Sequence, residues 1–158
     1  MFREMRRKRQ LLTEGETLDI LLKGTSGVLS LLGDDGYPYG VPLSYVYHEN
    51  KIYFHGAKSG HKLDAVRNCD KASFCVIAQD QVHPETFTTH YKSVIAFGKI
   101  HVVEDSAERR ASIEILGRKY SPGLEEKMEQ EIEKDDKILN MFVLEIEYMT
   151  GKQCIELV

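Results

Sequence analysis

Residues 37–62, YPYGVPLSYVYHENKIYFHGAKSGHK, contain the pattern that decides the fold. Aromatic and β-branched residues alternate with prolines from Tyr37 to Tyr47, and a second apolar run covers Lys51 to His55. The polar residues between the two runs are typical of a turn. We therefore predict two strands that pair as a hairpin. Pro38 and Pro42 cannot donate ladder hydrogen bonds, so the first strand should be interrupted or lie at a sheet edge.

A helix is predicted before this hairpin. Thr13 and Glu16 form a capping-box pattern, in which the threonine is the N-cap and the glutamate stands at the third helical position. The apolar periodicity then continues to Lys23, and Gly24 is expected to end the helix as a C-cap glycine.

The rest of the chain reads as further short strands with few helices. Most strands follow one another without a helix between them, which excludes a doubly wound α/β fold and favours an antiparallel sheet. We expect one mainly β domain over residues 1–158, a β-barrel of about six strands with peripheral helices. The predicted strands are 27–32, 37–47, 51–55, 71–78, 88–103 and 140–148, and residues 152–158 are a possible further strand with a weaker alternation. A loop is predicted over 79–86. The further predicted helices are 61–67, 106–120 and 124–138.

Composition excludes some classes of function. The formal net charge of the 158-residue chain is −4, whereas general nucleic-acid binding needs a basic excess. The basic start MFREMRRKRQ is an exception that we interpret as a solvated arm. No apolar stretch is long enough for a signal peptide or a membrane span. The three cysteines have no metal-site spacing and suit a reducing compartment, so we expect a cytoplasmic protein that binds no metal, membrane or nucleic acid.

The segment after the second strand of the hairpin has the chemistry of an anion site. A helix begins near Ser59–Gly60, with Ser59 as the expected N-cap, and a helix N-terminus offers free backbone N–H groups to an anion. Lys58, His61 and Lys62 add positive charge there. Cations at this end oppose the helix dipole, and a bound phosphate would relieve that cost. The alternative is a solvated basic helix start.

The proline-rich strand offers a second hint. Near Pro42, backbone N–H and C=O groups without ladder partners would be available to the polar edge of a planar ring. The alternative is an ordinary edge strand that prolines interrupt. The residues alone leave both alternatives open.

Four segments together resemble a known family. These are GYPYGVPLSYVY, KIYFHGAKSGHKLDAVRNCDKASFCV, YKSVIAFGKI and EIEYMTGK. In this order they are similar to the pyridoxamine 5′-phosphate oxidase-related flavoproteins with the FMN-binding split barrel, and most similar to the nitroimidazole-resistance branch. The resemblance covers roughly residues 5–152. Each motif alone is weak, but the combination is specific.

The resemblance implies an antiparallel split barrel and a homodimer with FMN at the subunit interface. Backbone groups of Pro42, Leu43 and Ser44 would bind the isoalloxazine edge. The end of the second hairpin strand would lie beside the ring or the ribityl chain. The start of the helix that follows this strand would hold the phosphate. Tyr91, Ser93 and Val94 lie on the strand that faces flavin in the family, from either chain of the dimer. The residues implied at the strand end and the helix start are His55, Gly56, Ala57, Lys58, Ser59, His61 and Lys62.

One departure from the family pattern limits what carries over. The oxidases proper have a Ser-Arg-Lys series in the phosphate loop, whereas this chain has Ser59-Gly60-His61 and lacks the arginine. Oxidation of pyridoxamine phosphate is therefore not the expected activity.

His55 is the candidate catalytic residue, because the corresponding histidine of the nitroimidazole-resistance branch is associated with the flavin site and with substrate chemistry. The alternative is a strand-end histidine with local hydrogen bonds. His83, His90 and His101 are interpreted as structural, and of these His90 is the most plausible neighbour of a flavin.

Three functions follow from these expectations. The first is an FMN-dependent oxidoreductase that passes electrons from a reduced donor to a small acceptor, such as a nitroaromatic compound. The chain has no G-x-G-x-x-G motif, so a nicotinamide donor would have to dock transiently on the flavin. The second is a non-catalytic flavin- or haem-binding module. The third is a domain that has lost its ligand, which the clustered cations after His55 argue against.

Overall fold

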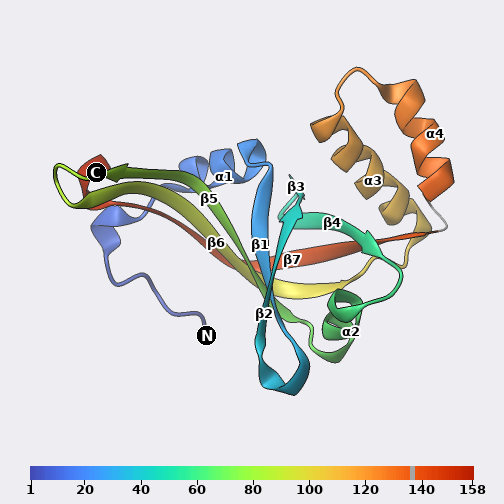
Figure 1. Ribbon diagram of the computed structural model, residues 1–158, viewed down its shortest axis with the longest axis horizontal. Coiled ribbons are helices and arrows are strands. Elements are labelled where there is room, and N and C mark those ends of the chain that lie inside the picture. The colour runs from blue at the N-terminus through green and yellow to red at the C-terminus, as the bar shows by residue number, and fades with distance from the viewer. Residues whose placement is uncertain (136–137) are drawn as a thin grey trace.

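The computed structural model describes residues 1–135 and 138–158 of the chain. In these described residues, seven strands form one sheet and four α-helices lie around it (Figure 1). The strands are β1 (Ser26–Leu32), β2 (Pro38–Ser44), β3 (Val46–His48), β4 (Lys51–Ala57), β5 (Lys71–His83), β6 (Thr88–Val102) and β7 (Leu139–Gln153). The helices are α1 (Glu14–Lys23), α2 (His61–Asn68), α3 (Ser106–Tyr120) and α4 (Glu125–Asp135).

The sheet has the strand order β2-β1-β5-β6-β7-β4-β3, and neighbouring strands in this order are antiparallel to each other. It is strongly curved but open, since β2 and β3 stand at its two edges (Figure 1). The expected mainly β, antiparallel architecture is therefore confirmed, with a split rather than a closed barrel. The expectation of about six strands falls one short of the seven that form.

The predicted hairpin is only partly correct. The hairpin partner of β4 is the short strand β3, and its other neighbour is β7, whereas β2 pairs with β1 along its whole length at the opposite edge of the sheet. The predicted first strand is interrupted at Tyr45, which lies between the end of β2 and the start of β3. The side chain of Tyr45 is buried in the main core. The prolines are thus on an interrupted edge strand, as their missing N–H groups require.

Two other boundaries differ from the prediction. The predicted loop over 79–86 is wrong at its start, because β5 continues to His83 and forms a long arm with β6 (Figure 1). The predicted last strand over 152–158 is also wrong. Its first two residues belong to β7, and Ile155–Leu157 form a 3-10 turn. The helix predicted over 124–138 is confirmed as α4 in the described residues, and positions 136–137 lie outside them.

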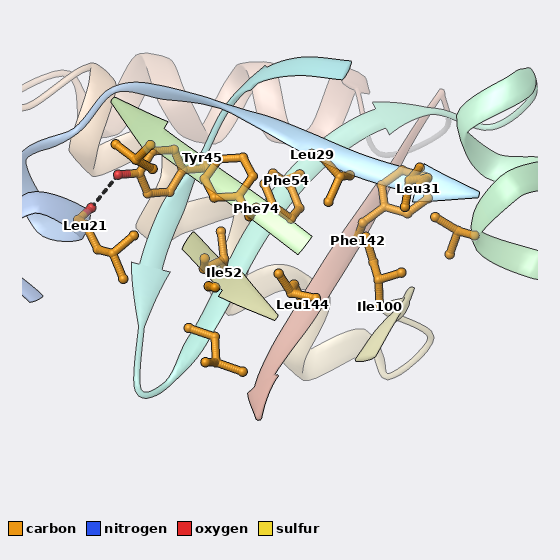
Figure 2. Packing of buried hydrophobic residues seen from close by; sticks show 14 of the residues in the cluster. Leu21, Leu29, Leu31, Tyr45, Ile52, Phe54, Phe74, Ile100, Phe142 and Leu144 are labelled. Carbon is orange, nitrogen blue, oxygen red and sulfur yellow. Dashed lines mark hydrogen bonds between the residues drawn. The ribbon is translucent and has the colours of Figure 1, made fainter. Parts of the chain in front are cut away.

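The main core lies between the sheet and the helices α1 and α2. The rings of Tyr45 and Phe54 both meet Phe74 edge-on, with centroids 4.9 and 5.0 Å away. All three side chains are fully buried (Figure 2). The Tyr45 hydroxyl donates to the carbonyl of Leu21 in α1 at 2.8 Å, so this polar group is satisfied inside the core (Figure 2).

Helix α1 begins as predicted. The Thr13 hydroxyl accepts from the Glu16 backbone N–H, and the Glu16 carboxylate accepts from the Thr13 N–H at 2.9 Å. Gly24 ends the helix as predicted, but it does not adopt the left-handed conformation for which a C-cap glycine is usually needed. Its φ of −62° is accessible to any residue. A Cβ atom at this position would lie 2.4 Å from the Tyr45 hydroxyl, so close packing requires the glycine.

A second, smaller core lies on the other side of the sheet beneath α3. Met141 and Val143 of β7 and Tyr53 of β4 are buried there against Leu116 of α3. The α3 helix therefore covers β3, β4 and β7, and α4 folds back beside it (Figure 1). In the described part of the chain, no helix is long and apolar enough to cross a membrane.

Candidate functional site

The junction between β4 and α2 carries the residues predicted to bind a phosphate. The N-cap of α2 is Gly60, with a φ of 113°, and it makes no side-chain cap hydrogen bond. The prediction that Ser59 is the N-cap is therefore wrong by one residue. A positive φ is a conformation that glycine adopts without strain. Ala57, Lys58 and Ser59 are exposed just before this turn.

His61 lies against the turn between β1 and β2. Its ring stacks on Tyr39, with centroids 4.0 Å apart and an interplanar angle of 16°. Its Nε2 atom is 3.8 Å from a carboxylate oxygen of Asp34. This histidine therefore links the start of α2 to the β1–β2 turn, a contact that the sequence pattern did not predict.

Lys62 is the most enclosed cation of the cluster. Its Nζ atom lies 5.6 Å from the centroid of the Phe142 ring. A Cβ atom at Gly56 would lie 2.8 Å from the same Nζ, so the glycine makes room for the lysine. Burial lowers the pKa of Lys62, because desolvation disfavours the charged form. The structure thus brings Gly56, His61 and Lys62 together around the start of α2.

The proline-rich strand supplies one further predicted residue to the neighbourhood of His55. Pro42 and Ser44 are exposed on the edge strand β2, while the Leu43 side chain is half-buried against the main core. Although β2 does not pair with β4, Ser44 and His55 line the same cavity. Ser44 therefore lies near His55, as predicted, but the two residues share a cavity wall and are not on paired strands.

This cavity has a volume of about 440 Å³ and lies between the sheet and the α3–α4 pair. Its sheet wall consists of Ser44, His55, Leu139 and Met141. His55 is exposed, and its ladder partner in β7 is Met141. We call it the α3–α4 cavity.

Helices α3 and α4 provide the opposite wall, which the sequence interpretation did not assign to any site. Leu124, Met128 and Ile132 recur at every fourth position in an otherwise charged segment, and all three line the cavity. Such spacing places them on one helical face. This apolar stripe is the signal from which the wall could have been found. Lys127 and Glu131 add polar groups, and α3 contributes Ile113, Leu116, Gly117 and Tyr120.

The predicted flavin contacts on β6 lie elsewhere. Ser93 pairs with Lys152 near the end of β7, whereas His55 pairs with Met141 near its start. Val94 is fully buried in the main core, so its side chain faces away from any ligand on the outer surface of the sheet. Tyr91 lies two positions before Ser93, with the Lys152 Nζ 5.6 Å from its ring centroid. Neither Tyr91 nor Ser93 lines the α3–α4 cavity.

The outer surface of the sheet beside Ser93 is unusually apolar. Ile77 is 66% exposed, and Val28, Ile95 and Phe97 are each between 38 and 40% exposed. These four residues, on β1, β5 and β6, form what we call the outer apolar face. Phe2 from the N-terminal arm lies at its border, with its ring centroid 5.7 Å from that of Phe97. Exposed apolar groups on neighbouring strands mark an interaction surface.

His83 and His90 lie together at the tip of the β5–β6 arm. The ring centroids of His83 and His90 are 3.8 Å apart, and His83 Nδ1 lies 3.0 Å from a Glu85 carboxylate oxygen. His101 is exposed on β6. Within the described residues, no group of three or more His, Cys, Asp or Glu side chains is arranged to hold a metal ion.

Comparison with known proteins places this architecture in a family. A family model described as pyridoxamine 5′-phosphate oxidase matches residues 13–153, nearly the whole chain. The chain therefore belongs to the pyridoxamine 5′-phosphate oxidase family, which confirms the resemblance drawn from its motifs. Comparison with curated protein sequences gave no match.

Solved structures share the fold. A candidate 5-nitroimidazole antibiotic resistance protein from Bacteroides thetaiotaomicron is 18% identical, with a TM-score of 0.75 over 90% of this chain and 86% of its own. A flavocytochrome from Azotobacter vinelandii is 17% identical, with a TM-score of 0.80 over 96% and 72%. An FAD- and haem-binding protein from Mycobacterium smegmatis is 22% identical, with a TM-score of 0.78 over 92% and 74%.

Proposed function

We propose that this protein is an FMN-binding oxidoreductase that works as a homodimer. The observation that carries the proposal is the position of Lys62, a half-buried cation at the start of α2 and against Gly56. Burial of a charged lysine costs free energy unless an anion compensates it. The α2 N-terminus and the adjacent His61 complete a set of donors that suits a phosphate group.

The rest of the flavin would extend from this phosphate site toward Ser44 and His55. Backbone groups of Pro42, Leu43 and Ser44 would meet the polar edge of the ring, and Gly56 and Ala57 would allow close approach of the ribityl chain. Lys58 and Ser59 would complete the phosphate site. Flavin binding by two neighbours in the same fold, the FAD- and haem-binding protein and the flavocytochrome, supports this assignment.

A second chain would complete the site. Tyr91 and Ser93 are near the far end of the β6–β7 ladder from His55, next to the outer apolar face. Pairing of two outer apolar faces would bury Ile77, Ile95 and Phe97 and would bring these β6 residues to the flavin of the partner. Val94, which is buried in the core, would act only by holding the strand in place.

When bound, FMN would supply the two-electron chemistry, and the protein would provide position and electrostatics. His55 would contact the reacting groups from the sheet wall, where an imidazole can donate or accept a proton near neutral pH. The acceptor would be a small molecule, and a nitroaromatic compound is the candidate that the likeness to the Bacteroides protein favours. We expect the protein to work in the cytoplasm.

A non-catalytic flavin- or haem-binding module is the second candidate, and the haem-binding neighbour in this fold favours keeping it. The test is the visible absorption spectrum of the purified protein, with mass spectrometry of the ligand released on denaturation. A flavin spectrum with released FMN supports the proposal, and turnover with a reduced nicotinamide separates enzyme from binder. A Soret band favours the haem alternative. A colourless protein that takes up no added FMN overturns the flavin assignment.

A further inference from the structure

We infer that the N-terminal arm, residues 1–10, binds the phosphate groups of a nicotinamide dinucleotide that docks on the flavin of the partner chain. This inference rests on the proposed function, because it locates the electron donor at the proposed flavin site. The chain has no G-x-G-x-x-G motif to hold such a donor, so the donor needs another docking surface. The arm contains five of the 21 Lys and Arg residues of the chain and only one of its 25 acidic residues.

The arm is fixed on the sheet near both of its ends, although its cations are exposed. Near its start, the Phe2 ring stacks on Tyr148 of β7, with centroids 5.2 Å apart and an interplanar angle of 11°. Just after its end, Leu11 forms an antiparallel bridge with Lys152 of β7. The arm therefore lies along the C-terminal part of β7 and does not extend freely into solvent (Figure 1).

Lys152 connects the arm to the residues that are proposed to meet the flavin of the partner. It lies directly opposite Ser93 in the β6–β7 ladder, so the two side chains are on the same face of the sheet. Tyr91, two positions before Ser93, shares that face, and the Lys152 Nζ lies 5.6 Å from its ring centroid. Pairing of two outer apolar faces would therefore bring the arm to the flavin of the partner together with Tyr91 and Ser93.

The arginines of the arm are available to an anion. Lys8 pairs with Glu4 at 3.2 Å, whereas Arg6, Arg7 and Arg9 are exposed and make no ion pair within the described residues. Guanidinium groups suit phosphate, because their N–H donors form paired hydrogen bonds with its oxygens. Several like charges in a short segment also repel one another, and a bound polyanion would relieve this cost.

The dimensions and the aromatic groups along the arm favour a dinucleotide over a simple anion. From Lys152 to Tyr148 the strand rises about 13 Å, at about 3.3 Å per residue, and an extended dinucleotide can cover this span. Phe2, at the Tyr148 end, is 41% exposed and offers a stacking surface to an adenine base. The arginines favour the form with a 2′-phosphate, because arginine commonly accommodates that group.

A nucleic acid is the other polyanion that a basic arm could bind. Outside the arm, however, acidic residues outnumber lysine and arginine. A long polyanion would meet repulsion there, whereas a dinucleotide is short enough to contact the arm alone.

The test measures the binding of NADP⁺ to the full chain by isothermal titration calorimetry at low salt, with and without FMN. Joint replacement of Arg6, Arg7 and Arg9 by glutamine removes three exposed charges that form no ion pair within the described residues, so this arginine variant should fold. Low salt is needed because exposed charges are strongly screened at high ionic strength.

Two controls separate a binding site from a general attraction between charges. Arg67, Lys71 and Arg118 are exposed cations outside the arm, and their joint replacement by glutamine gives a charge-matched variant with the same net charge. Phe2→Ala keeps every charge but removes the contact with Tyr148 that fixes the arm, and Phe2→Tyr restores an aromatic ring.

We expect one NADP⁺ per chain in the natural protein, and at least about tenfold weaker binding in the arginine variant and in Phe2→Ala. The charge-matched variant and Phe2→Tyr should bind NADP⁺ nearly as tightly as the natural protein, and NAD⁺ should bind about tenfold less tightly because it lacks the 2′-phosphate. An equal loss in the arginine variant and the charge-matched variant would overturn the inference. Tighter binding of a short single-stranded DNA than of NADP⁺ would overturn it as well.

FMN binding separates this inference from the proposed function. FMN affinity should be unchanged in the arginine variant, and a loss would overturn the inference by assigning the arm to the flavin phosphate. If the natural protein takes up FMN but the arginine variant binds NADP⁺ as tightly as the natural protein, the inference fails and the proposed function stands. If the natural protein binds NADP⁺ through the arm but takes up no FMN, the flavin proposal fails and the assignment of the arm stands.

Discussion

The Nζ atom of Lys62 lies 5.6 Å from the centroid of the buried Phe142 ring, so a cation of the proposed phosphate site rests directly on the main core. The contact joins the start of α2 to β7. A cation over an aromatic face gains some attraction, but burial still lowers the pKa of Lys62. The ligand-free protein thus keeps a charge at a position where an apolar group would be more stable.

Replacement of Lys62 by methionine should separate binding from stability. Methionine keeps most of the aliphatic contact with Phe142 but removes the charge, so we expect FMN affinity to fall about 10- to 100-fold, the range for one charge-assisted hydrogen bond. The melting temperature of the ligand-free protein should stay the same or rise. Fluorescence titration with FMN and thermal unfolding measure the two effects. Arg67→Met, at the other end of α2, is the control and should leave FMN affinity unchanged. Unaltered FMN binding in Lys62→Met would remove the phosphate assignment.

His55→Gln tests the proposed catalytic role. Glutamine keeps hydrogen-bonding capacity on an exposed side chain, so the variant should fold and retain FMN. We expect kcat/KM for the acceptor to fall about 100-fold, the lower range for loss of a general acid or base. The pH profile of kcat/KM should also lose one limb, which a merely structural role would not change. A profile identical to that of the natural protein would show that His55 carries no proton in the reaction.

Ile95→Glu tests whether the outer apolar face forms the dimer. Ile95 is 40% exposed and lies between Cys75 of β5 and Thr150 of β7 in the sheet. A carboxylate there would have to be desolvated in the interface, so the dimer should weaken by at least about 100-fold. Sedimentation velocity over a concentration series measures this. Glu147→Gln, an exposed position on β7, serves as the control. The interface assignment fails if Ile95→Glu remains a dimer.

The fold was largely predictable because its signals are local. The capping box of Thr13 and Glu16, the apolar run of β1, the alternation in β6 and the apolar spacing of α3 each depend on neighbours within a few residues. The pairing of β2 was not predictable in this way. The apolar run of β2 is followed and preceded by a turn, so its local pattern fits a hairpin with β1 as well as one with β4. Which strand β2 pairs with depends on the burial of Tyr45 in the core.

The parts of the candidate site that come from one continuous segment of the chain were predictable from the sequence. The contacts between segments that are far apart in the sequence were not. The cations after His55 could be located because Lys58, His61 and Lys62 lie close together in the sequence. The stacking of His61 on Tyr39 and the cavity beneath Met128 depend on how α2 and α4 pack, which sequence periodicity does not fix. The Ser59 assignment failed because Ser59 and Gly60 are adjacent cap candidates, and only the positive φ of Gly60 distinguishes them.

Glu108 should make the attachment of α3, and so the wall of the cavity, dependent on pH. Its carboxylate accepts from Lys51 Nζ and from the Tyr53 hydroxyl, each at 2.8 Å. These hydrogen bonds, first that of Lys51, lower the pKa of Glu108 below its usual value of 4.5. A carboxyl whose pKa is lower in the folded state contributes stability above its unfolded pKa and loses it as the pH falls through the folded pKa.

Glu108→Gln should therefore reduce the free energy of unfolding by about 1 kcal/mol at pH 7, a value discounted for partial exposure. The difference from the natural protein should shrink as the pH falls below about 4.5 and through the lowered pKa of Glu108 in the folded state. Urea unfolding at a series of pH values measures it, with Glu104→Gln, an exposed residue just before α3, as the control. A destabilisation that is equally large at pH 7 and near pH 2 would show that Glu108 acts through packing and not through its charge.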